Sequence, residues 1–191
     1  LTSTPAFGQD PANPDFPPIE RVTEGYTKVV STTDGKPSFY TLWVRGKDNQ
    51  MLAELPKDFA RQKHFFALTV SSGNPFAGLQ SGDMYVYWRQ YGNRLALIAP
   101  NLDIRSTGDN ESRSSVRRLF TDTVLLDVPI LTVVPRGGPV IDLDELLVRN
   151  ATVFFGEEGR TGRPQLAQIV KSKAFPENVE IAFEIPAADG H

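Results

Sequence analysis

One short segment constrains the fold of this chain more than any other. Two runs rich in aromatic and aliphatic residues, 84–91 and 94–98, are separated by Gly92-Asn93. A two-residue connection of this kind suits the positive φ angles of a tight β-hairpin turn. The turn length sets the register and predicts two cross-strand pairs, Trp88 with Leu97 and Tyr87 with Ile98. We therefore expect an antiparallel sheet built around this hairpin.

Five further segments have the composition of strands, with β-branched or aromatic residues between turn formers: residues 39–44, 51–55, 64–70, 124–134 and 179–185. The first two form a hairpin across the turn at 46–49, and 39–44 is apolar on both faces, as in a central strand. Pro129 interrupts the fourth and predicts a sheet edge or a bulge. The last alternates between apolar and polar residues, which predicts a half-buried strand.

Helical patterns are fewer and shorter. We expect helices over residues 116–120, after Asp142, and over 165–174. Residues 20–31 fit either a helix or a strand, 107–115 form a polar loop, and 102–105 extend the sheet. Together these patterns predict an α+β fold, with a mainly antiparallel β-sheet and a few short helices.

The amino-terminal segment differs from the rest of the chain. Residues 1–19 hold five prolines and few core-forming residues, so we expect a flexible tail followed by a single β-rich domain over 20–191. Ala6-Phe7-Gly8 places small residues where a signal peptidase cuts. This pattern is either the remnant of an export signal or an ordinary linker.

The composition excludes several classes of chemistry. The 191 residues include no cysteine and two histidines, His64 and His191, so the chain alone offers neither a thiolate site nor a three-histidine zinc site. The formal net charge of −3 disfavours nucleic-acid binding, and no apolar run is long enough to span a membrane. We predict no catalytic, cofactor-binding or metal-ligating residue in this chain.

Two groups of residues are candidates for contacts with a ligand or another domain. Arg113, Arg117 and Arg118 lie around a serine-rich stretch and would hold an anion or an acidic partner surface, unless they only form a solvated helix face. Tyr87 and Trp88, with their neighbours Tyr85 and Tyr91, would offer rings to a peptide or glycan, unless they pack in the core.

An acidic cluster comes after residues 140–141. Asp142, Asp144 and Glu145 supply the oxygens that a hard cation prefers. Asp142 and Glu145 also have the spacing of a capping box, in which Asp142 caps a helix and Glu145 reaches back. We favour capping. A hydrolase that uses two carboxylates also stays open, because it needs a cleft with acids about 5–10 Å apart that no sequence pattern reveals.

Several segments, read in order, resemble the amino-terminal, functionally uncharacterised region of large exported bacterial zinc-dependent metallopeptidases. The resemblance covers residues 26–185 and rests on these stretches: NQMLAELP at 49–56, GDMYVYW at 82–88, RLALI at 94–98, RSTGD at 105–109, SSVRRLF at 114–120, VVPRGGPVID at 133–142 and AFPENVE at 174–180. The last two are the most family-like.

The resemblance implies a role without catalysis. In that family the zinc-binding helix, with its H-E-x-x-H-x-x-G-x-x-H pattern, lies in a metzincin-like domain downstream, and no such pattern occurs here. The chain then corresponds to an accessory region that holds no zinc itself, is inactive alone, and packs on or regulates the catalytic domain of the same polypeptide. The implied location is the periplasm, the outer surface or the extracellular medium. The alternative is an independent peptide- or glycan-binding module of an exported protein.

Overall fold

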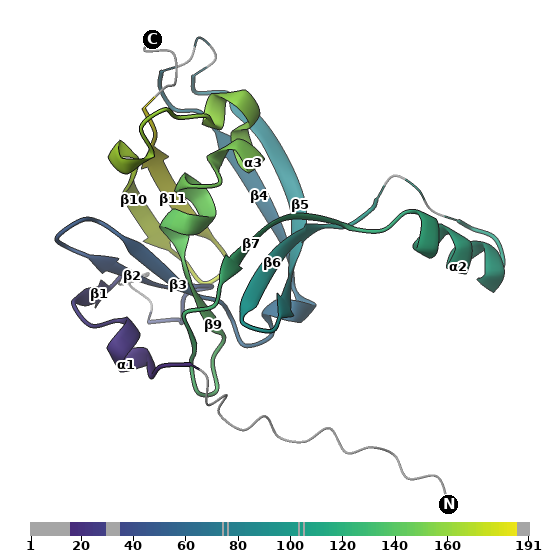
Figure 1. Cartoon of the computed structure of the whole chain (residues 1–191), viewed down its shortest axis with the longest axis horizontal. Coiled ribbons are helices and arrows are strands. Elements are labelled where there is room, and N and C mark those ends of the chain that lie inside the picture. The colour runs from purple at the N-terminus through teal and green to yellow at the C-terminus, as the bar shows by residue number, and fades with distance from the viewer. Residues whose placement is uncertain are drawn as a thin grey trace, which may run out of the picture.

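Three antiparallel sheets surround one hydrophobic core in the computed structural model (Figure 1), which describes residues 16–29, 35–73, 75, 77–102, 104 and 106–186. This arrangement confirms the predicted α+β class with a mainly antiparallel sheet. Residues 1–15, with the Ala6-Phe7-Gly8 pattern and most of the predicted tail, lie outside the described residues, as does His191. Within the described part, the Pro17 carbonyl accepts a 2.6 Å hydrogen bond from the Thr132 hydroxyl.

The largest sheet has five strands in the order β1-β2-β3-β9-β8. Their bounds are Tyr26–Lys28 (β1), Thr41–Arg45 (β2), Met51–Glu54 (β3), Thr132–Val133 (β8) and Pro139–Asp142 (β9). The predicted hairpin of residues 39–44 and 51–55 is confirmed, because β2 pairs antiparallel with β3 and Val44 lies opposite Met51. β2 also pairs with β1, so it is central, as its two apolar faces predict.

A four-stranded sheet and a separate two-stranded sheet complete the β structure. The first has the order β4-β5-β6-β7, with bounds Lys63–Thr69, Gln80–Tyr91, Arg94–Ala99 and Thr123–Pro129; the second pairs β10, Gln168–Ala174, with β11, Val179–Glu184. The register predicted from Gly92-Asn93 is confirmed, since Trp88 pairs with Leu97 and Tyr87 with Ile98. The alternation predicted for residues 179–185 is confirmed in β11, whose residues are half-buried and exposed in turn.

The helices are short. They are α1 (Ile19–Val22), α2 (Asn110–Leu119), α3 (Ala151–Phe155), the 3₁₀ turns η1 (Phe59–Arg61), η3 (Gly156–Gly159) and η4 (Pro164–Leu166), and the π-helical turn η2 (Asp144–Val148). Residues 20–31, which fit either a helix or a strand, contain most of α1 and then β1. The segment 30–34 lies outside the described residues.

Three expectations about secondary structure are wrong. Residues 165–174 form η4 and then β10, because pairing with β11 outweighs a helical spacing of apolar side chains. Residues 110–115 belong to α2, because Asp109 caps that helix. Leu102 and Ile104 lie outside any strand, while the other two residues of 102–105 are not described.

Pro129 acts as its position in the sequence predicts. β7 ends at this proline and is an edge strand of the four-stranded sheet, where a missing backbone N–H costs little. The long apolar run 124–134 is therefore two strands, since β8 belongs to the five-stranded sheet. The run links two sheets that share one core.

The acidic cluster is partly a helix cap. Asp142 Oδ1 accepts hydrogen bonds from the backbone N–H groups of Asp144 (2.9 Å) and Glu145 (3.3 Å), which confirms the predicted cap. The predicted return of Glu145 is wrong, because its Oε2 accepts a 2.6 Å bond from Arg149 one helical turn later. Asp144 Oδ2 accepts the Met51 N–H at 2.9 Å, so these carboxylates tie the chain after β9 to β3.

A buried polar chain crosses the core between the two larger sheets. The Trp88 indole Nε1 donates a 3.0 Å hydrogen bond to the Tyr40 hydroxyl, which lies 3.4 Å from His64 Nδ1. All three residues are buried. The tautomer of the ring sets which of these two groups donates the bond, and Nε2 is the second ring nitrogen of His64. That nitrogen has no partner among the described residues.

We expect this histidine to make the fold sensitive to mild acid. Burial lowers the pKa of His64 below its ordinary value of 6.5. The unfolded chain therefore binds a proton at a pH where the folded chain does not, and stability is lost as the pH falls from about 6.5 to the folded pKa, at up to about 1.4 kcal/mol per pH unit. Urea unfolding of His64→Leu and the parent chain, at pH 7.5 and 5.5, measures this difference. An equal pH dependence in both proteins would contradict the assignment.

Candidate functional site

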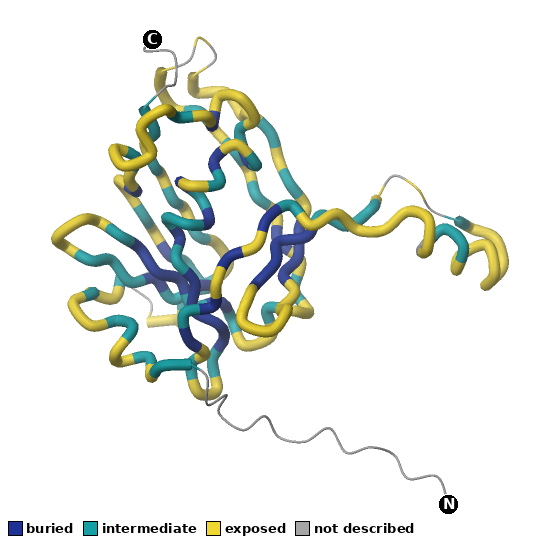
Figure 2. The backbone as a smooth tube through the Cα atoms, in the orientation of Figure 1, coloured by how far each residue is buried: buried dark blue, intermediate teal, exposed yellow. Residues whose placement is uncertain are grey.

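An arm formed by residues 100–122 is the most distinctive surface feature of the described chain. It connects β6 to β7, which are neighbours in the sheet, and it carries α2 away from the body of the molecule (Figure 1). Most of its described backbone is exposed (Figure 2). A connection between paired strands needs only a few residues, so the rest of the arm is available for a purpose other than closing the sheet.

The helix of the arm has its own start signal. Asp109 has an extended backbone, and its Oδ1 accepts a 2.8 Å hydrogen bond from the Ser112 N–H, as in an N-cap. This bond lowers the pKa of Asp109, so the carboxylate stays charged beside the positive helix end. The cap pairs one of the free N–H groups at the start of this solvent-exposed helix.

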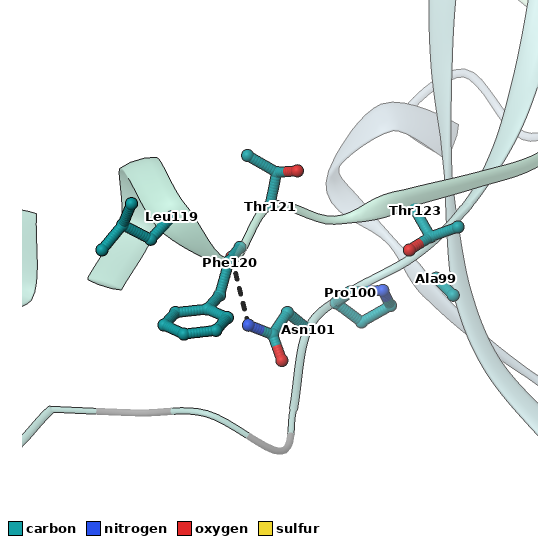
Figure 3. A pocket seen from close by; sticks show the side chains of 7 residues that line it. All are labelled: Ala99, Pro100, Asn101, Leu119, Phe120, Thr121 and Thr123. Carbon is teal, nitrogen blue, oxygen red and sulfur yellow. Dashed lines mark hydrogen bonds between the residues drawn. The ribbon is translucent and has the colours of Figure 1, made fainter. Parts of the chain in front are cut away.

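The arm exposes apolar side chains where it leaves the sheet. The exposed fraction is 74% for Leu119, 43% for Phe120, 44% for Leu102 and 41% for Ile104. A shallow hollow lies beside the end of α2 (Figure 3), lined by Ala99, Pro100, Asn101, Leu119, Phe120, Thr121 and Thr123. Several large apolar side chains exposed together are typical of a surface that another molecule covers.

Hydrogen bonds to one carboxylate hold the base of the arm. Asp122 Oδ1 accepts from the Asn101 N–H at 3.0 Å, and Oδ2 accepts from the Tyr87 hydroxyl at 2.7 Å. Asn101 Nδ2 also donates to the Phe120 carbonyl at 3.1 Å (Figure 3). The Tyr87 bond, followed by the Asn101 bond, lowers the pKa of Asp122. Both ends of the arm are thus fixed to each other and to β5.

Two positively charged side chains lie against the Tyr87 ring on the outer face of the four-stranded sheet. Lys63 Nζ lies 4.5 Å from the centre of the Tyr87 ring, and the Arg89 guanidinium lies 5.4 Å from it. Arg89 also donates to the Tyr87 oxygen at 3.2 Å. Burial, and then the hydrogen bond to Asp122, raise the pKa of Tyr87, so it remains a neutral donor to that carboxylate.

The structure separates the residues that sequence analysis grouped as contact candidates. Arg113 and Arg118 are exposed on α2; Arg117 also belongs to α2, but its side chain is not described. Tyr87 anchors the arm and is 8% exposed, and Trp88 is 1% exposed and points into the core, so neither ring is open to a ligand.

Two of the residues that hold the arm in place, Asp122 and Asn101, were not found from the sequence. Asp122 belongs to no motif and acts through Tyr87 and Asn101, which are distant along the chain. Leu119 and Phe120 end the predicted helix 116–120, and nothing in their spacing indicates that they are exposed. The signal for the arm in the sequence is a polar segment between two strands that pair directly.

No group of three or more His, Cys, Asp or Glu side chains in the described ranges is arranged to hold a metal ion. The hollow in Figure 3 has no carboxylate in its lining, so it gives no support to a two-carboxylate hydrolase. None of the helices in the described part is long and apolar enough to cross a membrane.

We expect Asp122→Asn to loosen the arm without unfolding the domain. The asparagine keeps one acceptor but loses the charge that strengthens both hydrogen bonds, so the N–H of Asn101 should exchange with deuterium at least tenfold faster. Hydrogen exchange with peptide-level mass spectrometry measures this change. Asp127→Asn, which removes the carboxylate partner of Arg94 at the other end of β7, is the control. Unchanged exchange at the arm base would rule out the Asp122 anchor.

No protein-family model, curated protein or solved structure matches this chain.

Proposed function

We propose that this chain is a non-catalytic accessory domain, the amino-terminal region of an exported zinc-dependent metallopeptidase, and that it docks through the arm on the catalytic domain of the same polypeptide. The observation that carries the proposal is the exposure of Leu119, Phe120, Leu102 and Ile104 on a projecting arm with an ordered base. Burying large apolar side chains stabilises a contact by about 1.5–3 kcal/mol each.

The three arginines of α2 indicate the nature of the surface that this part of the arm meets. Arg113, Arg117 and Arg118 give α2 three positive charges within six residues. Arginine pairs readily with carboxylates at contact surfaces, often through two parallel hydrogen bonds. The partner surface should therefore combine an apolar patch with acidic side chains around it.

Zinc chemistry, in this proposal, belongs to the partner domain. The family resemblance implies a zinc ion in the catalytic domain, but this chain has no cysteine and only two histidines, so its own residues do not fit a zinc site. The accessory domain would position or regulate the enzyme, outside the cytoplasm, and would not supply a group to the reaction.

Binding of the isolated chain to the downstream domain tests the proposal. The separately expressed downstream domain is titrated with the parent chain and with the double variant Leu119→Ser, Phe120→Ser. We expect binding of the parent chain and at least a tenfold weaker affinity for the variant, because central apolar contacts dominate such surfaces. Leu166→Ser with Val170→Ser, two exposed apolar residues outside the arm, is the matched control. Equal binding by both double variants would exclude docking through the arm.

The alternative function, an independent peptide- or glycan-binding module, has one observation in its favour. Tyr85 and Tyr91 are about half exposed on β5, on the same face as Lys63 and Arg89. Tyrosine rings beside polar groups are common in ligand-binding surfaces. This candidate needs no catalytic domain and uses a surface other than the apolar part of the arm.

A further inference from the structure

The free edge of β4 suggests a binding site for an extended polypeptide. β4 is the first strand of the order β4-β5-β6-β7, and within the described residues its sole strand partner is β5. No backbone hydrogen bond from a described loop reaches residues 63–69. An edge strand of this kind presents a row of unpaired N–H and C=O groups, which another extended chain can pair with.

The other sheet edges in the described chain are protected. β1 and β8 have three and two residues, and β7 carries Asp127 and ends in Pro129. β10 has a bulge and two lysines, and β11 carries exposed glutamates. Short length, charges, bulges and prolines are the usual means by which edges avoid added strands. β4 has seven residues, no proline, and Lys63 as its one charged residue.

The two faces of β4 differ in a way that positions an added strand. Its inward residues pack in the core, and the Phe66 ring stacks on Phe154 of α3 at 6.1 Å. Its outward residues are exposed, with Phe65 at 64%, and Phe65 lies opposite Tyr85 in the register with β5. A strand paired with β4 would therefore place every second side chain beside Lys63 and Phe65.

The charges on this outer face favour an acidic occupant. Neither Lys63 nor Arg89 forms an ion pair with a described residue; both lie over tyrosine rings. The nearby Asp122 carboxylate is already hydrogen-bonded to Tyr87 and Asn101. A second copy of this chain would bring the same cations to the edge, whereas a carboxylate two residues from an apolar side chain would match Lys63 and Phe65.

We propose that the edge of β4 binds an extended, acidic polypeptide segment as an added strand, with a carboxylate beside Lys63 and an apolar side chain beside Phe65. The proposal deepens the peptide-binding alternative and rests on it; it does not depend on docking through the arm. If the full-length polypeptide is a peptidase, such a segment has the chemistry of a polypeptide substrate.

The test uses a fluorescein-labelled nonapeptide rich in valine and threonine, with one glutamate and one phenylalanine two residues apart. Fluorescence anisotropy measures its affinity for the chain. We expect saturable binding that weakens at least tenfold in Lys63→Glu and in Phe65→Ser, and less than twofold in Lys171→Glu and Val170→Ser on β10. A peptide with lysine in place of glutamate should bind Lys63→Glu more tightly than the parent chain. Circular dichroism verifies that each variant is folded.

A second peptide distinguishes binding at the edge of β4 from binding to the exposed tyrosine rings of β5. Methylation of alternate backbone nitrogens prevents strand pairing but keeps every side chain, so we expect this peptide not to bind. Equal binding of the methylated peptide would overturn the edge site and leave the peptide-binding alternative in place. No binding of any peptide would overturn both. Sedimentation showing a dimer that Phe65→Ser disperses, or binding of an acidic polysaccharide in place of the peptide, would also overturn the proposal.

Discussion

Replacing Trp88 with alanine should lower the free energy of unfolding more than any other single side-chain truncation, by about 3–5 kcal/mol. Trp88 is 1% exposed and packs between the two larger sheets. Its removal leaves a large cavity and takes the indole donor away from Tyr40, whose hydroxyl then has one partner fewer in the core. Both effects act in the folded state and add to each other.

Urea unfolding followed by circular dichroism measures this loss. Tyr91→Ala on the same strand is the control, because Tyr91 is about half exposed and its truncation should cost less than about 1 kcal/mol. Tyr40→Phe separates the hydrogen bond from the cavity, with an expected loss of about 1–2 kcal/mol. Similar losses in the Trp88 and Tyr91 variants would show that the core has been placed on the wrong face of β5.

The second large effect is expected at Gly138, between β8 and β9. A Cβ atom at this position would collide with the carbonyl groups of Leu55 and Pro56, which are backbone atoms and cannot rotate away. Gly138 also accepts a 3.0 Å hydrogen bond from the Val134 N–H, which fixes its position in the turn. We therefore expect Gly138→Ala to lower the free energy of unfolding by about 2–3 kcal/mol.

Gly162→Ala is the matched control for this prediction. A Cβ at Gly162 has nothing within 4 Å, so this substitution should change stability by less than about 0.5 kcal/mol. Thermal unfolding of both variants provides the comparison. If the Gly138 variant melted within a degree of the parent chain, the close approach of the 134–139 turn to residues 55–56 would be incorrect.

Local signals predicted the parts of the fold that short-range geometry controls. The turn at Gly92-Asn93 determines the pairing of β5 with β6, and alternation identifies β11. The local signals were wrong where pairing with another segment of the chain determines the secondary structure. The apolar residues of 165–174 fit a helical face, yet β10 forms because β11 offers a strand to pair with. No property of that segment alone distinguishes the two outcomes.

The candidate site was less predictable than the fold. Asp109 is a residue type that caps helices, but the polar residues that follow it predicted a loop. Asp122 joins Tyr87 and Asn101, which lie on other segments, so its role follows from the sheet order and not from a motif. Sequence could identify the arginines of the arm, but not that the arm projects from the body.

The proposed function requires the arm to be a docking element of a larger protein. The most direct measurement compares hydrogen exchange in the isolated 191-residue chain with exchange in the full natural polypeptide, after mass spectrometry has established its length. Docking should bury Leu119 and Phe120 and slow exchange of the α2 amides at least tenfold in the full polypeptide. Equal exchange rates for α2 in both proteins, or a natural polypeptide without a further domain, would contradict the proposed function.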